Sequence, residues 1–419
     1  MEKIVVKGGN KLSGEVNISA AKNSVLPIIA ASILCPEKVI IENIPMLQDV
    51  KVICSLLEEL NSDVYVSDTE NKLLIDTKKI LVADADSELI RKMRASFLIM
   101  GPMLARFGYC KLSLPGGCNI GSRPIDLHLK GFKTMGAEIN SGHGFIEVKA
   151  KKLLGERIYL DFPSVGATEN ILMAAALADG TTIIENAAEE PEIWDLANFL
   201  NSMGAQISGA GTGKITIDGV GSLKGIKYKP IYDRIEAGTF IIAAAMTNSK
   251  IKINGINEEH VRPLIEKLKE CGIDFQEDNE TIVVDGTKEK KAVDIKTMPY
   301  PGFPTDMQPQ MMSLLSIING SSMVTETVFE NRFMHVAELV RMGAKIKIDG
   351  RTAFVEGVNR LTGCEVKATD LRAGAAMILA GLVAEGSTEI SDIYHIDRGY
   401  INIEEKFRNL SADIIRIDK

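Results

Sequence analysis

The densest group of residues that could do chemistry lies in the segment LSLPGGCNIGSRPIDLH, residues 112–128. Cys118 stands in it among glycines and a proline, and Arg123 follows five residues later. A thiol in such a loop near an arginine can have a shifted pKa and take part in proton transfer. The alternative is a cysteine that fills space as a small buried hydrophobe. The loop composition alone leaves both readings open.

Charged residues also recur where apolar helices are expected to begin. Lys22 and Asn23, in SAAKNSV, stand at the start of one such helix. A helix N-terminus offers free N–H groups and a favourable dipole to an anion, although a solvated lysine beside an asparagine cap is the alternative here. The same position in other repeats carries two arginines and two aspartates: Arg94, Arg372, Asp306 and Asp370. We expect these groups to gather at the facing ends of two domains.

Two further segments are rich in arginine. FENRFMH contains Arg332, and YHIDRGY contains Asp397 and Arg398. Arginine grips carboxylate or phosphate groups through two parallel hydrogen bonds, so both segments are candidates for binding an anionic ligand. His335 and His395, which lie in the same segments, are interpreted as structural rather than catalytic.

The chain is organised as a repeat. A helix end that runs into a strand recurs in KTMGAEINS, LNSMGAQIS, LKECGIDFQ and LVRMGAKIK, with weaker copies EELNSDVYV and FRNLSADII. The glycine or serine of each copy stands at position 62, 136, 204, 272, 343 or 411, so the repeating unit is close to 70 residues long. A glycine there permits the left-handed cap that ends a helix before a strand.

Each unit also contains an almost wholly apolar helix, such as SVGATENILMAAALA or RIEAGTFIIAAAM. A helix that is apolar all round is buried, so we expect these helices inside their domains. Six units divide into two domains of three. We place the first domain, with the Cys118 loop, at residues 22–231, and the second at residues 1–21 plus 232–419. The N-terminal strands close the second domain, because the chain ends just after the first strand of the sixth unit.

Bulk composition argues against several classes of function. The 419 residues are 45% hydrophobic and 25% charged, as in globular proteins, and the net charge of −8 argues against nucleic-acid binding. The longest apolar stretch, Val25 to Cys35, is too short to cross a bilayer, and MEKIVVKGGNK lacks a signal-peptide core. We therefore expect a cytoplasmic protein. The six cysteines form no CxxC pair and no zinc-type spacing, which indicates reduced thiols and no metal site.

Taken together, the sequence resembles the UDP-N-acetylglucosamine enolpyruvyl transferases, which belong to the EPSP synthase superfamily. The resemblance runs from end to end. It rests on segments that occur in the family's order: SAAKNSVLP, MRASF, LPGGCNIGSRPIDLH, SVGAT, ENAAEEPEI, YDRIEAGTF, FPTDMQ, TETVFENRFMH, TDLRAG and YHIDRGY. It implies a two-domain inside-out α/β barrel built from six repeated units.

The resemblance also implies a reaction, which opens the synthesis of peptidoglycan precursors. The enolpyruvyl group of phosphoenolpyruvate passes to the 3′-hydroxyl of UDP-N-acetylglucosamine by addition and elimination, and phosphate is released. The substrates are then the two partners, and no cofactor, metal, nucleic acid, membrane or obligate protein partner is implied.

Site residues follow from the resemblance position by position. The catalytic residues would be Cys118 as the acid, Asp306 as the acceptor of the hydroxyl proton, and Lys22. Phosphoenolpyruvate would be bound by Lys22, Asn23, Arg123, Arg372 and Arg398. The UDP-sugar would contact Arg94, Arg123, Pro124, Ile125, Asp126, Leu127, Ser164, Val165, Gly166, Asp306 and Val328. Phe162 and Pro163 depart from the family's pattern just before Ser164, where the resemblance implies contacts to the diphosphate.

Two other functions compete with this one. The sister enzyme, which transfers enolpyruvyl to shikimate 3-phosphate, shares the fold and the donor but lacks the PGGC loop. A non-catalytic UDP-sugar-binding regulator could also keep the fold. Intact Cys118, Asp306, Arg123 and Arg398 argue against lost catalysis.

Overall fold

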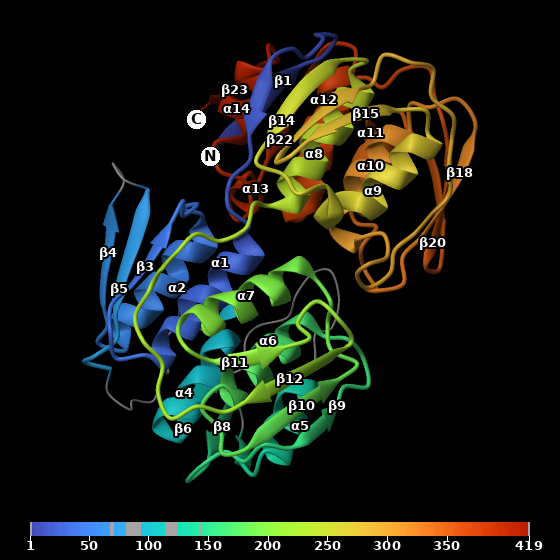
Figure 1. Cartoon of the computed structure of the whole chain (residues 1–419). Coiled ribbons are helices and arrows are strands. Elements are labelled where there is room, and N and C mark those ends of the chain that lie inside the picture. Colours follow the sequence, from blue (N-terminus) through green and yellow to red (C-terminus); the bar gives the residue numbers. More distant parts are fainter. Residues whose placement is uncertain (1, 68–70, 81–93, 114–124, 143, 418–419) are drawn as a thin grey trace. The chain divides into compact units, whose positions relative to one another are not determined.

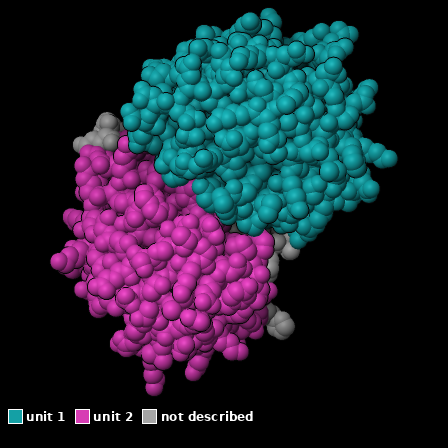
Figure 2. All heavy atoms as spheres, turned by 45° about the vertical axis from the view of Figure 1, so that its right-hand side comes forward, with its two compact units in different colours: residues 1–19, 118–122, 232–419 teal, residues 20–117, 123–231 magenta. Residues whose placement is uncertain are grey.

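The computed structural model describes residues 2–67, 71–80, 94–113, 125–142 and 144–417. These residues form two compact units, shown in different colours in Figure 2. The described residues of unit 1 are 2–19 and 232–417, and those of unit 2 lie between residues 20 and 231. The chain therefore leaves unit 1 after Ser19 and returns to it at Tyr232.

Three sheets form the outer layer of unit 2 (Figure 1). Their strand orders are β13 (Lys227–Tyr228)–β3 (Val39–Glu42)–β5 (Lys72–Asp76)–β4 (Asp63–Ser67), then β6 (Tyr109–Ser113)–β8 (Phe145–Lys149)–β7 (Glu138–Gly142), and β11 (Gln206–Ser208)–β12 (Lys214–Asp218)–β10 (Thr181–Glu185)–β9 (Arg157–Tyr159). The two four-stranded sheets each combine a parallel pair with an antiparallel hairpin.

Unit 1 repeats this plan. Its strand orders are β15 (Asp274–Asp278)–β16 (Thr281–Asp285)–β14 (Lys250–Asn254)–β2 (Glu15–Asn17), then β17 (Ile295–Lys296)–β18 (Ser321–Thr325)–β20 (Thr352–Glu356)–β19 (Lys345–Asp349), and β21 (Glu365–Lys367)–β22 (Ser387–Ser391)–β1 (Lys3–Lys7)–β23 (Asp413–Ile417). In the last sheet β1 lies between β22 and β23 and is antiparallel to both. The start of the chain thus supplies the strand that joins the final two.

The apolar helices lie inside the sheets, as predicted. They are α1 (Lys22–Ala31), α4 (Met100–Phe107) and α6 (Val165–Ala175) in unit 2, and α8 (Arg234–Met246), α10 (Gln308–Leu315) and α12 (Leu371–Val383) in unit 1. Every residue of α8 after Arg234 is buried, and α8, α10 and α12 contact one another. Burying a large aliphatic side chain contributes about 1.5–3 kcal/mol, so these helices form the cores of their units.

Each repeat also contains an amphipathic helix, and this helix ends at the left-handed residue that the sequence pattern indicates. They are α2 (Gln48–Glu59), α5 (Asp126–Thr134), α7 (Pro191–Ser202), α9 (Glu258–Glu270), α11 (Val336–Arg341) and α14 (Ile403–Asn409). A glycine with positive φ follows four of them, as at Gly136, and Ser411 follows α14 with φ 73°. In the first repeat the predicted position, Ser62, is wrong by one residue: Asn61 has φ 65°. Asparagine tolerates this conformation because its short polar side chain bonds locally.

The described residues also contain four shorter helices: η1 (Ser32–Leu34), η2 (Arg94–Ile99), η3 (Thr305–Met307) and α13 (Tyr394–Asp397). In the part of the chain that the structure describes, every helix is too short or too polar to span a membrane.

Candidate active site

Polar residues mark the starts of the central helices in every repeat. They are Lys22 at the first position of α1, Arg94 at the first position of η2 before α4, Ser164 before α6, Asp233 before α8, Asp306 in η3 before α10, and Asp370 before α12. The repeat explains this, since each unit turns from an outer strand into an inner helix at this point. Backbone N–H groups at helix starts attract anions and carboxylate caps.

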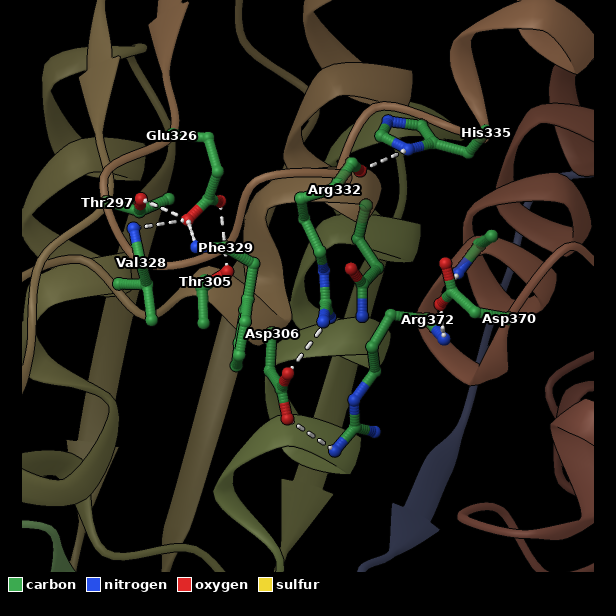
Figure 3. Close-up of polar contacts among 12 residues, drawn as sticks. Thr297, Thr305, Asp306, Glu326, Val328, Phe329, Arg332, His335, Asp370 and Arg372 are labelled. Carbon is green, nitrogen blue, oxygen red and sulfur yellow. Dashed lines mark hydrogen bonds and ion pairs between the residues drawn. The ribbon is translucent and has the colours of Figure 1, made fainter. Parts of the chain in front are cut away.

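Asp306 lies between two buried arginines (Figure 3). Arg332 Nη2 donates to Asp306 Oδ1 at 2.9 Å, and Arg372 Nη2 donates to Oδ2 at 3.0 Å. The two arginine side chains are 2% and 4% exposed, whereas that of Asp306 is 28% exposed. The carboxylate is therefore held by one guanidinium on each oxygen while part of it still faces outward. The structure thus brings together two of the predicted site residues, Asp306 and Arg372.

Buried polar groups hold Arg372 in place. Its Nη1 donates to the Tyr400 hydroxyl at 3.2 Å, and that hydroxyl lies 2.9 Å from Thr239 Oγ1. Asp370 caps α12 by accepting from the backbone N–H of Arg372 at 2.8 Å. Burial acts most strongly, lowering the pKa of the Arg372 guanidinium, but Asp306, Tyr400 and Asp233 together outweigh it and the pKa is raised. Arg372 therefore stays charged.

His335 forms a hydrogen bond with the backbone of Arg332. Its ring is fully buried, and Nδ1 donates to the backbone carbonyl of Arg332 at 3.2 Å, because a carbonyl can only accept. Burial lowers the pKa of His335 to about 4, and the charge of Arg332 acts in the same direction. The ring is neutral at physiological pH, which fits the structural role predicted for it.

This lowered pKa has a measurable consequence for stability. An ordinary histidine has a pKa of 6.5, so between pH 6.5 and about 4 the unfolded chain binds a proton at His335 that the folded chain does not. Stability is then lost as the pH falls through this window. We expect His335→Gln, whose amide can still donate to Arg332, to remove this loss of unfolding free energy between pH 6.5 and about 4. Urea unfolding of both proteins at several pH values measures the free energy of unfolding, and parallel pH profiles of the two proteins would contradict the prediction.

The loop that carries Val328 is fixed by Glu326, which is 1% exposed. Its Oε1 accepts from the backbone N–H of Val328 at 2.8 Å and of Phe329 at 3.1 Å, and from Thr297 Oγ1 at 2.9 Å. Its Oε2 accepts from Thr305, the residue before Asp306, at 2.9 Å. One buried carboxylate thus links the Val328 loop to the helix start that carries Asp306 (Figure 3).

Several buried polar atoms near Asp306 find no hydrogen-bond partner among the described residues. They are Nε of Arg332 and of Arg372, Oδ2 of Asp370, and both amide atoms of Gln308. Buried polar atoms are almost always paired, with protein, water or ligand. Their concentration at one place is typical of a site that binds a polar ligand.

In unit 2, Lys22 begins α1 and is 9% exposed. Its Nζ lies 3.3 Å from Asp49 Oδ2, and Asn23 beside it is half-buried. The first turn of α1 is fixed by Asp195, which accepts from Ser24 Oγ and from the backbone N–H of Ile231 at 3.1 Å. Lys22 is thus a buried, paired lysine rather than a solvated one.

The segments predicted to contact the UDP-sugar begin two helices of unit 2. Ile125 precedes α5, where Asp126 is exposed and Leu127 is half-buried. Ser164 caps α6 by accepting from the Ala167 N–H at 3.4 Å, and Val165 and Gly166 follow it in the first turn.

The remaining predicted residues are placed as follows. Arg398 is half-buried and follows α13, and its neighbour Asp397 forms a two-pronged pair with Arg416 at 2.6 and 3.0 Å. Asp397 therefore forms a structural ion pair with Arg416. Cys118, Arg123 and Pro124 lie outside the described residues, and only the backbone of Arg94 is described.

The predicted residues divide between the two units. Unit 2 holds Lys22, Asn23, Arg94, Ile125, Asp126, Leu127, Ser164, Val165 and Gly166, and unit 1 holds Asp306, Val328, Arg372 and Arg398. Arg332 was noted as an arginine but not assigned to the site. Its position in an otherwise uncharged stretch, RFMHVA, was the signal that it is buried and therefore paired.

The described cysteines lie in or against the cores. Burial raises the pKa of the Cys54 and Cys110 thiols to about 12 and that of Cys271 to about 11. Burial also raises the pKa of Cys35 and Cys364. A protonated thiol is a poor nucleophile, so these five fill space. Among the described residues no three His, Cys, Asp or Glu side chains are placed to hold a metal ion.

Comparison with known proteins decides the family. The model of the family described as EPSP synthase (3-phosphoshikimate 1-carboxyvinyltransferase) matches residues 6–407. This chain belongs to that family. The predicted resemblance to its superfamily is thereby confirmed.

Relatives within the EPSP synthase family are similar over the whole chain. One from Clostridium tetani, named UDP-N-acetylglucosamine 1-carboxyvinyltransferase 2, is 66% identical over 417 residues, which cover 100% of both chains. One from Clostridium acetobutylicum, named UDP-N-acetylglucosamine 1-carboxyvinyltransferase 1, is 63% identical over 418 residues, again 100% of both.

Solved structures of the EPSP synthase family confirm the predicted fold. The enolpyruvyl transferase NikO from Streptomyces tendae matches with a TM-score of 0.89 at 25% identity, covering 99% of each chain. The EPSP synthase of Acinetobacter baumannii matches with a TM-score of 0.80 at 18% identity and covers 100% of each chain, which bears on the fold alone.

Proposed function

We propose that this chain transfers the enolpyruvyl group of phosphoenolpyruvate to the 3′-hydroxyl of UDP-N-acetylglucosamine. The observation that carries the proposal is the full-length identity of 66% and 63% to relatives named for this activity. The same family also contains shikimate-type enzymes, but the solved EPSP synthase is only 18% identical to this chain. The product is an early peptidoglycan precursor.

The reaction has two stages. In the addition, the 3′ oxygen forms a bond to C2 of phosphoenolpyruvate, its proton leaves to a base, and an acid gives a proton to C3. In the elimination, the bond from C2 to the phosphate oxygen breaks and inorganic phosphate leaves with the bonding electrons, a base takes a proton from C3, and the double bond forms again. The protein must therefore supply a base, an acid and positive charge for the phosphate and carboxylate.

Asp306 is the proposed base. Because Arg332 and Arg372 each bond one of its oxygens, the carboxylate is fixed in orientation. Its 28% exposure leaves room for an approaching hydroxyl. Arg332 is in this proposal a positioning residue that acts through Asp306.

Cys118 is the proposed acid, and the positive charge comes from Lys22, Arg123, Arg372 and Arg398. The start of α1 supports this, because Lys22 adds a buried cation to a helix N-terminus, a combination that suits a phosphate or carboxylate. Asn23 adds an amide at the same place. Lys22 and Asn23 belong to unit 2, whereas Arg372 and Arg398 belong to unit 1.

The UDP-sugar is proposed to contact the starts of α5 and α6, Asp306 and Val328. Ser164 caps α6, and Val165 and Gly166 lie in its first turn, where backbone N–H groups suit a diphosphate. Arg94, Arg123, Pro124 and the run from Ile125 to Leu127 complete the set. We also propose the cytoplasm as the place of action, because both substrates are multiply charged and do not cross a bilayer unaided.

One assay tests the function. Phosphate release from phosphoenolpyruvate is measured with UDP-N-acetylglucosamine, and separately with shikimate 3-phosphate. We expect release with the UDP-sugar alone. Release only with shikimate 3-phosphate would replace the proposal by the sister activity. Binding of the UDP-sugar without any release would instead indicate a non-catalytic regulator.

A further inference from the structure

A buried asparagine joins three helices of unit 2. Asn170, in the middle of α6, has no exposed surface. Its Oδ1 accepts from the backbone N–H of Gly101 on α4 at 2.8 Å, and its Nδ2 donates to the backbone carbonyl of Phe97 on η2 at 3.0 Å. The same Nδ2 lies 3.0 Å from Nδ1 of His128 on α5.

These contacts fix the orientation of the amide and, through it, the proton on His128. A backbone N–H can only donate and a backbone carbonyl can only accept, so the amide oxygen must face Gly101 and the amide nitrogen must face Phe97. One N–H of Asn170 then goes to Phe97, and the second points to His128 Nδ1. That nitrogen must be the acceptor, so the neutral ring carries its proton on Nε2.

The helices meet closely at this point. A Cβ added at Gly101 would lie 2.3 Å from the backbone oxygen of Asn170, and one added at Gly131 of α5 would lie 2.4 Å from the Ile171 side chain. A Cβ at Gly166 would lie 3.3 Å from the His128 ring. Glycine is needed at Gly101 because a side chain there would press on the backbone of Asn170 and force the helices apart, whereas at Gly131 the Ile171 side chain would have to shift.

The elements that Asn170 joins carry most of the proposed sugar contacts of unit 2. Arg94 begins η2, the run from Ile125 to Leu127 leads directly to His128, and Val165 and Gly166 lie in the first turn of α6. A shift of one helix against another at Asn170 would move these contacts apart.

We propose that Asn170 is the positioning residue of the UDP-sugar subsite. It holds η2, α4 and α5 against α6 and fixes His128 in the Nε2–H tautomer beside Gly166. This inference rests on the proposed function, because it assumes that the starts of α5 and α6 contact the sugar nucleotide.

Asn170→Asp is the sharpest variant, because it keeps the size and the acceptor for Gly101 but loses the NH₂ group: an ionised carboxylate donates to neither Phe97 nor His128, and a protonated one donates to a single partner. We expect the KM and the Kd for UDP-N-acetylglucosamine to rise about tenfold or more, since at least one buried group loses its donor. The KM for phosphoenolpyruvate should change far less. Calorimetric titration with the UDP-sugar measures the Kd without turnover.

A second asparagine of unit 2 supplies the matched control. Asn201, on α7, also clamps one backbone N–H and one carbonyl, both of Ile207 on β11, at 2.8 and 2.9 Å. The elements α7 and β11 carry none of the proposed contacts. We expect Asn201→Ala to lower the melting temperature without raising the KM or Kd for the UDP-sugar.

Nitrogen NMR of the wild-type protein tests the tautomer directly. We expect Nδ1 of His128 to show the shift of an unprotonated ring nitrogen and Nε2 that of a protonated one, and we expect Asn170→Asp to abolish this pattern. The opposite tautomer in the wild type would overturn the proposal. So would a folded Asn170→Asp protein with an unchanged Kd.

Two safeguards keep the test decisive. If Asn170→Asp does not fold, His128→Leu removes the acceptor on α5, and an unchanged Kd in that variant would overturn the proposal. If the wild type binds the UDP-sugar but releases no phosphate, the proposed activity fails while the Kd and NMR comparisons still decide the role of Asn170.

Discussion

Replacing Asp306 with asparagine is expected to lower kcat by about two to four orders of magnitude, the usual range for a lost general base. Asparagine keeps the shape but cannot accept the hydroxyl proton. It also presents one N–H₂ group to the guanidinium of Arg332 or Arg372, which can only donate, so one of the two contacts is lost. The Kd for UDP-N-acetylglucosamine should change much less.

Steady-state kinetics together with calorimetric titration separates these effects. Asp285→Asn serves as the control, since it removes one carboxylate from the same unit on strand β16, outside the proposed site. We expect that variant to keep normal turnover. Near-normal kcat in Asp306→Asn would mean that Asp306 only orients the substrate and that another group is the base.

Replacing Cys118 with alanine is expected to leave the enzyme nearly inactive, whereas Cys118→Asp should keep measurable turnover. A carboxylic acid at this position can also deliver a proton, provided the site raises its pKa enough to keep it protonated. Alanine has no proton to give. The loss in the alanine variant should be about two to four orders of magnitude in kcat.

A phosphonate epoxide that resembles phosphoenolpyruvate provides a second readout. It should alkylate the Cys118 thiolate and inactivate the native enzyme, while Cys118→Asp should resist it. Mass spectrometry should place the adduct on the peptide that contains LPGGCNIGSR. Cys110 is an internal control, because burial raises its pKa to about 12. An adduct on Cys110 or Cys364, or normal turnover by Cys118→Ala, would falsify the assignment.

Much of the fold could be predicted because it depends on residues that are close together in the sequence. The apolar run in RIEAGTFIIAAAM predicts the buried helix α8, and the glycine in LNSMGAQIS predicts the left-handed residue at Gly204. Both depend on neighbours a few residues apart. The error of one residue in the first repeat arose because asparagine takes the place of glycine there, and the serine beside it was taken as the equivalent.

The contacts within the site could not be predicted in the same way. Asp306, Arg332 and Arg372 come from separate segments, and nothing in a single sequence says that one carboxylate lies between two guanidiniums. The hydrogen bonds by which Asn170 joins neighbouring helices were missed for the same reason: its partners Gly101 and His128 are 69 and 42 residues away in the sequence. A sequence pattern identifies which residues could do chemistry, whereas pairings of this kind depend on how whole helices pack.

The position of β1 between β22 and β23 has a consequence for how the protein is made. The described residues of unit 2 lie between residues 20 and 231, so unit 2 can fold once residue 231 has left the ribosome. Residues 3–7 must instead wait for residues 413–417. At about 5–20 residues per second, synthesis of the roughly 400 intervening residues takes about 20–80 s. For most of that time β1 has neither neighbour, since β22 is made only shortly before β23, which makes unit 1 the later of the two to fold and the one more exposed to wrong strand pairing.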